Sequence, residues 1–151
     1  MEHALEIRFL DGSSTLPTLA YSESAAYDLS ANLRNDADRP FTATIAPHTT
    51  RLIGTGLAMR PPLGHLILIC SRSGLATKGI FVANAPGIVD PDYVGEIKVA
   101  LFNGSLEPCY IRHGDRIAQA LVVPFLSMPL RIVKEFPVTE RGEAGFGSSG
   151  A

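Results

Sequence analysis

The sequence lacks the features that place a chain in a membrane or direct it across one. It has no run of about eighteen apolar residues, and its start is not a cationic segment followed by an apolar stretch. A membrane-spanning helix needs about 20 predominantly apolar residues, and a secretory signal needs the cationic start. We therefore expect no membrane partner, no secretion and a cytoplasmic location.

Excess charge and cysteine are also scarce. Thirteen basic and fifteen acidic side chains leave a net charge of −2, which gives no reason to expect a nucleic-acid partner. Cys70 and Cys109 are the two cysteines, and they form no C-x-x-C motif. We expect them to be reduced, partly buried thiols. The four histidines lack metal-ligand spacing, so a protein zinc site is not expected.

The chain also has no long helical period and no internal repeat. Eleven prolines and fourteen glycines separate short apolar segments, a pattern typical of an all-β sandwich or barrel. A chain of 151 residues normally makes one domain. The expected strands include the apolar segments 51–59, 66–70, 96–103, 117–123 and 130–136.

The clearest alternation lies in the segment 96–103. Ile97, Val99 and Leu101 fall on one face of a strand, with other residues on the opposite face. Asp90 and Asp92 precede this strand in a turn, where Asp and Pro are favoured. A carboxylate there is exposed to a ligand, although an ordinary Asx turn is the favoured interpretation of Asp92.

A polar cluster follows the apolar run 66–70. Residues 73–78 predict one short helical turn, closed by Gly79. Because N–H groups at a helix start attract anions, Arg72 and the Ser73 hydroxyl beside them indicate a phosphate site. The pattern G-x-x-x-x-G-K-[ST] is absent, which argues against a P-loop.

Three polar residues lie in segments that otherwise look like buried strands. Asp28 needs a cation or a hydrogen bond if it is buried. Arg116 and Gln119 lie in a strand that starts after a turn. Arg116 can form an ion pair with Asp115 or Asp28, or it can contact a ligand. Gln119 can bind a ligand or hold a neighbouring backbone group, and the sequence leaves these alternatives open.

The last eleven residues contain one cation, one aromatic ring, four glycines and two serines. Such a segment cannot form a core, so we expect a β-rich core over 1–140 and a mobile arm over 141–151. Arg141 can pair with a phosphate and Phe146 can stack on a base, while glycine and serine N–H groups can surround an anion. The alternative is a flexible solubilising terminus.

These five clusters, in this order, resemble the five motifs of the trimeric dUTP pyrophosphatases (dUTPases). The family patterns are A-G-x-D-L, P-R-S-G-L-A, G-x-I-D-x-D-Y-x-G, G-[DE]-R-I-A-Q and R-G-x-G-G-F-G-S-[ST]-G, and matches extend from about Ala25 to Gly150. The departures are Ala26 for Gly, Ser71 for Pro, one residue fewer between Lys78 and Gly79, Val94 for Arg or Gln, and Ala144 for Gly. No departure removes a group expected to carry chemistry.

The resemblance implies a jelly-roll-like subunit in a homotrimer with shared active sites. It also implies Mg²⁺-dependent hydrolysis of dUTP to dUMP and pyrophosphate, which keeps uracil out of DNA and supplies dUMP for thymidylate synthesis. Asp90 would orient and deprotonate the attacking water. Asp28 would hold, through a water, a Mg²⁺ carried mainly by the triphosphate.

The resemblance also assigns contacts with the nucleotide. The α- and β-phosphates would be bound by Arg72, Ser73, Gly74 and Gln119, and the γ-phosphate by Arg141, Gly147 and Ser148. Phe146 would stack over uracil, and Tyr93 would pack beneath the deoxyribose and exclude a 2′-hydroxyl. The hairpin from Asn84 to Asp90 would read uracil, with Gly87, Ile88 and Val89 in its wall. Lys98 occupies a ligand-contact position, or is a solvated lysine.

Three alternatives to this activity stay open at this point. A dCTP deaminase shares the fold, but the intact D-x-D-Y segment and the R-G-x-x-G-F-G tail favour the pyrophosphatase. A regulatory dUTPase-fold protein that binds nucleotide and a protein partner is the second alternative. A purely structural protein is the third.

Overall fold

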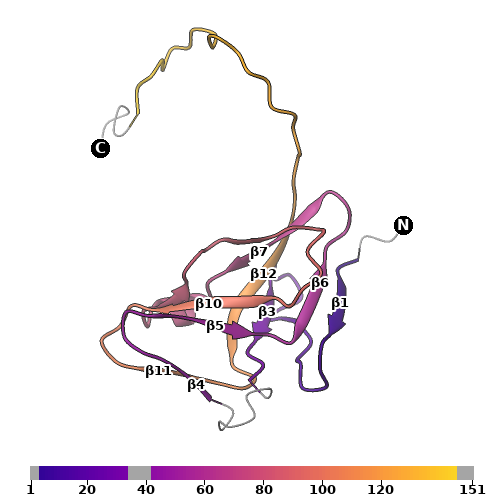
Figure 1. Cartoon of the computed structure of the whole chain (residues 1–151), viewed down its shortest axis with the longest axis vertical. Helices are drawn as coiled ribbons and strands as arrows, with labels where there is room; N and C mark the ends of the chain where they lie inside the picture. The colour runs from indigo at the N-terminus through magenta and orange to yellow at the C-terminus, as the bar shows by residue number, and fades with distance from the viewer. Residues whose placement is uncertain (1–3, 34–41, 146–151) are drawn as a thin grey trace.

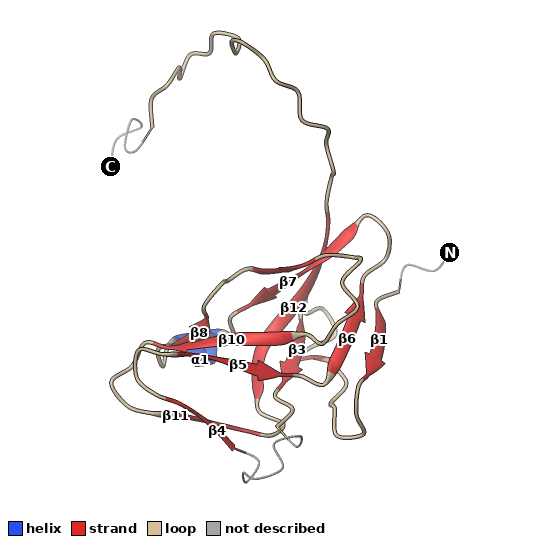
Figure 2. Cartoon of the chain, in the orientation of Figure 1, coloured by secondary structure: helices blue, strands red, loops and turns tan. Residues whose placement is uncertain are grey.

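The computed structural model of the protein describes residues 4–33 and 42–145. Within these ranges no helix is long and apolar enough to span a bilayer. Figure 1 traces the strands and Figure 2 shows how little helix accompanies them. The elements are β1 (Glu6–Phe9), β2 (Thr18–Leu19), β3 (Tyr27–Ser30), β4 (Thr42–Ile45), β5 (Thr50–Gly54), β6 (Leu57–Arg60), β7 (His65–Cys70), α1 (Ser73–Ala76), β8 (Ile80–Val82), β9 (Gly87–Val89), β10 (Lys98–Asn103), β11 (Cys109–Arg112) and β12 (Arg116–Pro124). The predicted all-β class is confirmed.

The strands form four antiparallel sheets. The largest has the order β2-β3-β12-β7-β9, and a second has the order β5-β10-β8. Two-stranded sheets pair β1 with β6 and β4 with β11. Within the largest sheet β12 is central, because it pairs with β3 on one side and with β7 on the other. Residues of β3 and of the end of β7 are therefore brought beside the same stretch of β12.

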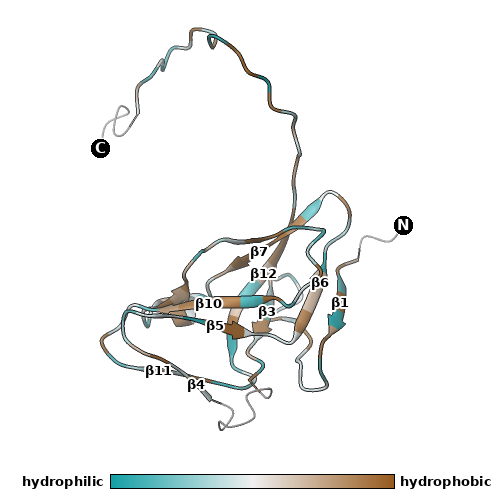
Figure 3. Ribbon diagram, in the orientation of Figure 1, coloured by the Kyte–Doolittle hydropathy of each residue, from teal (hydrophilic) through white to brown (hydrophobic). Residues whose placement is uncertain are grey.

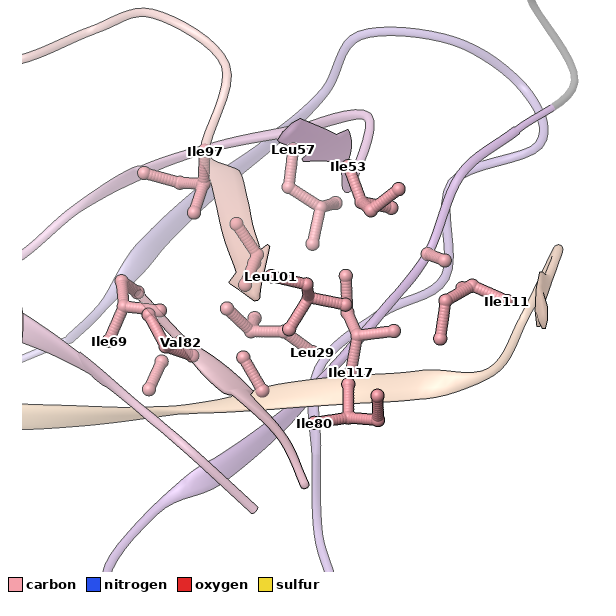
Figure 4. Close-up of a cluster of buried hydrophobic side chains, with 14 of the residues drawn as sticks. Leu29, Ile53, Leu57, Ile69, Ile80, Val82, Ile97, Leu101, Ile111 and Ile117 are labelled. Atoms are coloured by element: carbon pink, nitrogen blue, oxygen red, sulfur yellow. The ribbon is translucent and has the colours of Figure 1, made fainter. Parts of the chain in front are cut away.

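The core lies between the sheets and is almost entirely aliphatic. Figure 4 shows Leu29 of β3, Ile53 of β5, Leu101 of β10 and Ile117 of β12 pointing toward one another, and each is 1% exposed or less. Full burial of a side chain of this kind contributes about 1.5–3 kcal/mol. The core therefore holds the strands that carry the polar clusters in fixed relative positions.

The predicted alternation of the 96–103 segment is confirmed in β10. Val99 and Leu101 are completely buried. On the other face Lys98 is exposed, and Ala100 and Phe102 are partly buried. The predicted strand at 51–59 is instead two strands, β5 and β6, which belong to different sheets. The break lies at Gly56, whose φ is +66° and where a Cβ would overlap the side chains of Asn32 and Ser14.

A polar cluster secures the loop after β1. The Asp11 carboxylate accepts hydrogen bonds from the Ser13 N–H at 2.7 Å, the Ser13 hydroxyl at 2.6 Å and the Asn32 amide at 2.8 Å. These bonds favour the ionised carboxylate, with those from Ser13 contributing most, and lower the pKa of Asp11 from 3.8 to about 2. The cluster therefore ties this loop to the residues that follow β3.

The expectation of a strand at 130–136 is wrong for the single chain. Regular structure among the described residues ends at Pro124, and the chain then runs away from the sheets (Figure 1). Leu130 and Ile132 are fully exposed, and Figure 3 shows apolar and polar residues mixed along this segment. The residues have strand-like composition, but no strand in the described part of the chain pairs with them. The expected boundary at residue 140 stays a prediction.

Candidate active site

The first cluster of the candidate site is an ion triad made by Asp28, Arg72 and Arg116. The Arg72 Nε donates to Asp28 at 2.7 Å, and an Arg116 guanidinium nitrogen donates to the other carboxylate oxygen at 3.1 Å. The Asp28 side chain is only 9% exposed, while that of Arg116 is 55% exposed. The expectation that a buried Asp28 needs a cation is confirmed, and the Asp28 alternative for Arg116 is the one observed.

The triad exists because three strands meet there. Asp28 is directly opposite Gln119 in the β3–β12 pair, and Gln119 is opposite Cys70 in the β12–β7 pair. Arg72 follows β7 by two residues, so its side chain reaches back across the sheet. A guanidinium nitrogen of Arg72 also donates to the Arg116 carbonyl at 3.2 Å. Segments that are distant in the sequence are thereby joined into one cationic surface.

Gln119 holds a backbone group, which was one of its two open alternatives. Its Nε2 donates to the Ser71 carbonyl oxygen at 3.1 Å. The Ser71 hydroxyl in turn accepts a hydrogen bond from the Val82 N–H at 2.9 Å. Both bonds fix the turn that leads from β7 into α1.

The predicted helical turn after β7 is confirmed as α1. It is shorter than the segment 73–78, and Gly79 follows it with a φ of +81°. Arg72 precedes the helix with an extended backbone, and the N–H of Ala76 donates to its carbonyl oxygen at 2.9 Å. Ser73 and Gly74 are both exposed. Ser73 and Gly74, two of the residues expected to bind phosphate, therefore lie at the surface next to Arg72 of the triad.

The expected hairpin from Asn84 to Asp90 is wrong in its pairing. The strand before it, β8, pairs with β10, whereas β9 pairs with β7. The segment therefore crosses from the three-stranded sheet to the five-stranded sheet. Asn84 is exposed and close to Gly87, where an added Cβ would lie 3.2 Å from the Asn84 amide nitrogen. Two of the predicted uracil-reading residues are thus adjacent.

The second cluster surrounds a hollow of about 240 Å³. Its lining residues are Ile88, Val89, Asp90, Tyr93, Glu96, Ile97 and Lys98. The Tyr93 hydroxyl donates to the Glu96 carbonyl oxygen at 2.9 Å. The Tyr93 ring covers Gly95 so closely that a Cβ there would lie 2.7 Å from a ring carbon. Five residues predicted to act on the nucleotide therefore share one hollow.

Lys98 has an ionic partner within this hollow. Its Nζ lies 3.5 Å from a carboxylate oxygen of Glu96, and its side chain is 54% exposed. The Glu96 carboxylate also accepts a hydrogen bond from the Gly56 N–H at 3.0 Å. Lys98 is accordingly a partly solvated lysine that still borders the hollow. Glu96 was not singled out from the sequence, since a single glutamate at the start of a strand carries no distinctive pattern.

The two clusters lie at opposite ends of β7. Val89 pairs with Ile67, so Asp90 lies near the beginning of that strand, whereas Arg72 lies beyond its end. A strand of six residues is about 16 Å long. The described part of one chain therefore does not bring Asp90 and Tyr93 beside the arginines.

The predicted residues of the tail are only partly described. Arg141 is exposed, and its Nε donates to the Ala144 carbonyl oxygen at 2.8 Å within a local turn. Phe146, Gly147 and Ser148 lie outside the described residues. In the single chain Arg141 is joined to neither cluster by a described bond, so its role in binding stays a prediction.

A second hollow, of about 520 Å³, borders the triad. Arg72, Lys78 and Arg116 line it together with Cys109 and residues of β11. Burial raises the pKa of the Cys109 thiol, and the negative charge of Asp115 adds to the effect. The thiol is therefore protonated near neutral pH, and both cysteines are free and partly buried, as the sequence indicated.

Comparisons with known proteins agree with this combination of fold and site. The family model of the dUTPases matches residues 13–150. The chain is 43% identical to the deoxyuridine 5'-triphosphate nucleotidohydrolase of Desulfotalea psychrophila and 44% identical to that of Coxiella burnetii. Each alignment covers 99% of both proteins.

Solved structures give the same result. A mutant dUTPase of Staphylococcus bacteriophage 80alpha with dUpNHpp has a TM-score of 0.88, with 26% identity over 99% of this chain and 100% of that one. A mutant dUTPase of the S. aureus phage phi11, described with a structural Mg(II) ion, shares the fold with a TM-score of 0.78. It is 22% identical over 89% of this chain and 99% of its own.

These findings define the class of the protein as a nucleotide hydrolase with an all-β subunit. Within that class, the chain belongs to the dUTPase family. The resemblance drawn from the five motifs is confirmed, and so is the jelly-roll-like subunit that it implied.

Proposed function

We propose that this chain hydrolyses dUTP to dUMP and pyrophosphate in a Mg²⁺-dependent reaction. The observation that carries the proposal is the triad, which presents Arg116 of β12 and Arg72, from the turn after β7, beside Ser73 and Gly74. The names of the full-length relatives support the same substrate and reaction.

Arg72 is prepared to bind phosphate by its bonds to the protein. A guanidinium has five N–H donors, and Arg72 uses one on each nitrogen, for Asp28 and for the Arg116 carbonyl. Two donors remain for a ligand, and the planar group is held in place by a mostly buried carboxylate. Charge-assisted hydrogen bonds to phosphate oxygens are about twice as strong as neutral ones. We therefore assign the α- and β-phosphates to Arg72 with the neighbouring Ser73 and Gly74. Gln119 is kept as a proposed contact through the amide N–H that does not bond Ser71.

Asp90 is proposed to orient the attacking water and to accept its proton. It is exposed at the rim of the hollow that also holds Tyr93 and Lys98. The Tyr93 N–H donates to the Asp90 carbonyl oxygen at 3.1 Å, so the two residues belong to one turn. General-base assistance of this kind is typically worth about 10²–10⁴ in rate.

The residues present fit a Mg²⁺ that is held mainly by the triphosphate. Among the described residues no three His, Cys, Asp or Glu side chains gather as a metal cluster. The proposed cation would be carried mainly by phosphate oxygens and water. Asp28 accepts three hydrogen bonds from two arginines, and a carboxylate has about four acceptor sites. One position therefore remains for a metal-bound water. When bound, Mg²⁺ would neutralise phosphate charge and polarise the phosphoryl group.

Specificity is proposed to come from the hollow and the adjoining segment. The Tyr93 ring is fixed by its hydroxyl bond to Glu96 and by its packing over Gly95. A ring held in this way leaves little room for a 2′-hydroxyl on a sugar beside it. Gly87, Ile88 and Val89, together with Asn84, supply the groups proposed to read uracil.

The separation of the two clusters supports a homotrimer with shared active sites. About 16 Å of β7 lies between Asp90 and Arg72 in one chain, which is too far for both to act on one α-phosphorus. We propose that one chain supplies the triad, a second supplies the Asp90 hollow and a third supplies the tail with Arg141.

The proposed reaction is tested by the products formed from dUTP, dCTP and UTP with Mg²⁺. We expect pyrophosphate and dUMP from dUTP, whereas a deaminase would convert dCTP and release no pyrophosphate. Asp90→Asn should lower kcat by at least about a hundredfold and leave binding of a non-hydrolysable dUTP analogue nearly unchanged. The exposed Asp92→Asn is the matched control and should retain activity. More than about a tenth of wild-type kcat in Asp90→Asn would contradict the general-base role.

A further inference from the structure

Ser71 joins the proposed phosphate-binding turn to another sheet of the protein. It directly follows β7 of the five-stranded sheet and directly precedes Arg72. Its hydroxyl oxygen accepts a hydrogen bond of 2.9 Å from the N–H of Val82, the last residue of β8. Its carbonyl oxygen accepts a hydrogen bond of 3.1 Å from the Gln119 side chain. Ser71 therefore has both a side-chain and a backbone contact with its surroundings.

The backbone N–H of Val82 donates its hydrogen bond to the Ser71 side chain. β8 is an edge strand of the sheet β5-β10-β8, so only one of its sides is paired with another strand. Val82 is nevertheless only 2% exposed. A buried N–H that loses its acceptor destabilises the structure, because no water replaces the lost bond. The Ser71 hydroxyl therefore supplies the acceptor for this N–H on the side of β8 that no strand pairs with.

Of the two bonded partners, the strand is the fixed one. Val82 is opposite Leu101 in the β8–β10 pair, and both side chains are buried in the core. The turn after β7, by contrast, is partly exposed at Ser71 and Arg72 and exposed at Ser73. The hydrogen bond consequently restrains the turn against the strand.

We propose that Ser71 is a positioning residue that holds the phosphate-binding turn, and Arg72 with it, against β8. The inference rests on the proposed dUTP hydrolysis. The dUTPase motif has Pro at this position, and a Pro side chain has no hydroxyl to accept the Val82 N–H. The carbonyl contact with Gln119 is available to either residue, so the hydroxyl contact distinguishes this chain.

The test is Ser71→Ala, which deletes the acceptor and little else. We expect the KM for dUTP to rise about tenfold, as the loss of a buried hydrogen bond predicts. Inhibition by pyrophosphate with Mg²⁺ should weaken by a similar factor, because pyrophosphate needs only the phosphate-binding turn. Inhibition by deoxyuridine, which has no phosphate, should change less than twofold. A merely structural role would weaken both inhibitors together.

Three further variants complete the experiment. Ser71→Thr keeps the hydroxyl and should restore pyrophosphate inhibition to within about threefold of wild type. Ser71→Cys has a similar shape but a weak acceptor, so it should show the same selective loss in a smaller degree, even if the Ala variant folds poorly. Thr77→Val removes an exposed hydroxyl that, among the described residues, makes one long hydrogen bond of 3.5 Å to the Gly74 carbonyl oxygen, and the variant should behave as wild type.

The outcomes separate this inference from the proposed function. If wild-type protein releases no pyrophosphate from dUTP, the proposed function is wrong, whatever Ser71 does. If wild type is active and Ser71→Ala binds pyrophosphate normally, or loses deoxyuridine and pyrophosphate equally, the positioning role is wrong. Failure of Ser71→Thr to restore pyrophosphate inhibition would overturn it as well.

Discussion

Replacing Asp28 by Asn removes the negative charge that two arginines share. The amide keeps one acceptor oxygen, so a hydrogen bond to the Arg72 Nε can persist, but its NH₂ group faces a guanidinium instead of a carboxylate oxygen. Two cationic groups then lie close together without a counter-charge. We expect both a loss of stability and a loss of phosphate binding.

The expected loss of stability in Asp28→Asn follows from how exposed the Asp28, Arg72 and Arg116 side chains are. Asp28 and Arg72 have side chains that are 9% and 25% exposed, and breaking a buried pair costs about 3–5 kcal/mol. The Arg116 side chain is 55% exposed, so its bond contributes at most about 1 kcal/mol. Because Asn retains one acceptor, we expect a total loss of about 2–3 kcal/mol. For a domain of this size that corresponds to a decrease in Tm of about 4–12 °C.

Kinetics can distinguish the anchoring of arginines from the holding of a metal-bound water. If anchoring dominates, as we expect, the KM for dUTP should rise at least about tenfold, while the Mg²⁺ concentration for half-maximal activity changes less than about twofold. Melting curves, dUTP titrations and Mg²⁺ titrations on wild type, Asp28→Asn and the control Asp92→Asn would measure both effects. Asp92 is exposed, so its variant should resemble wild type.

An unchanged Tm and KM in Asp28→Asn, combined with a large increase in the Mg²⁺ requirement, would refute the anchoring argument. That result would mean that the two ion pairs contribute little and that the carboxylate acts through a metal-bound water alone.

Tyr93→Ala should lower dUTP turnover and narrow the preference for dUTP over UTP, because it removes the ring proposed to exclude a 2′-hydroxyl. An equal fall in kcat/KM for both substrates would show that the ring has only a packing role. Truncation after Glu140 should leave a near-native Tm and severely reduce kcat. Co-refolding the truncated chain with full-length Asp90→Asn chains should restore some pyrophosphate release, and no restoration in mixed trimers would contradict shared sites. Asp11→Ala should lower Tm at neutral pH. Because its pKa is lowered, the Asp11 carboxylate stabilises the fold above about pH 4, and this stabilisation is lost as the pH falls toward about 2. The Tm of the variant should therefore depend less on pH in that range. A variant with the same pH profile as wild type would contradict this assignment.

Local patterns in the sequence were sufficient to predict several elements and partners. Val99 and Leu101 of β10, and Ile97 just before it, are buried in alternation because this stretch has one face on the core, which is a property of the strand itself. A buried Asp28 had to find a cation, and Arg116 was among the candidates. In both cases the requirement, burial of one strand face or pairing of a buried carboxylate, follows from the residue types alone.

Features that depend on distant pairing were not predictable in this way. The 84–90 segment looks like a hairpin, but whether β9 pairs with β8 or β7 depends on which edge the rest of the fold leaves available. The hydrogen bond from Val82 to Ser71 joins two sheets and has no local sequence pattern. Apolar residues at 130–136 have strand composition, yet composition does not specify a partner strand.

The exposed apolar residues between β12 and residue 140 have a consequence for how the protein responds to dilution. Leu130, Ile132 and Val138 are completely exposed in the single chain, and covering each of them is worth about 1.5–3 kcal/mol. If this segment packs on another copy of the chain in the proposed trimer, that free energy is gained only through association, and the melting temperature should then increase with protein concentration. In a separated chain the same residues would remain an exposed apolar surface, of the kind that favours aggregation.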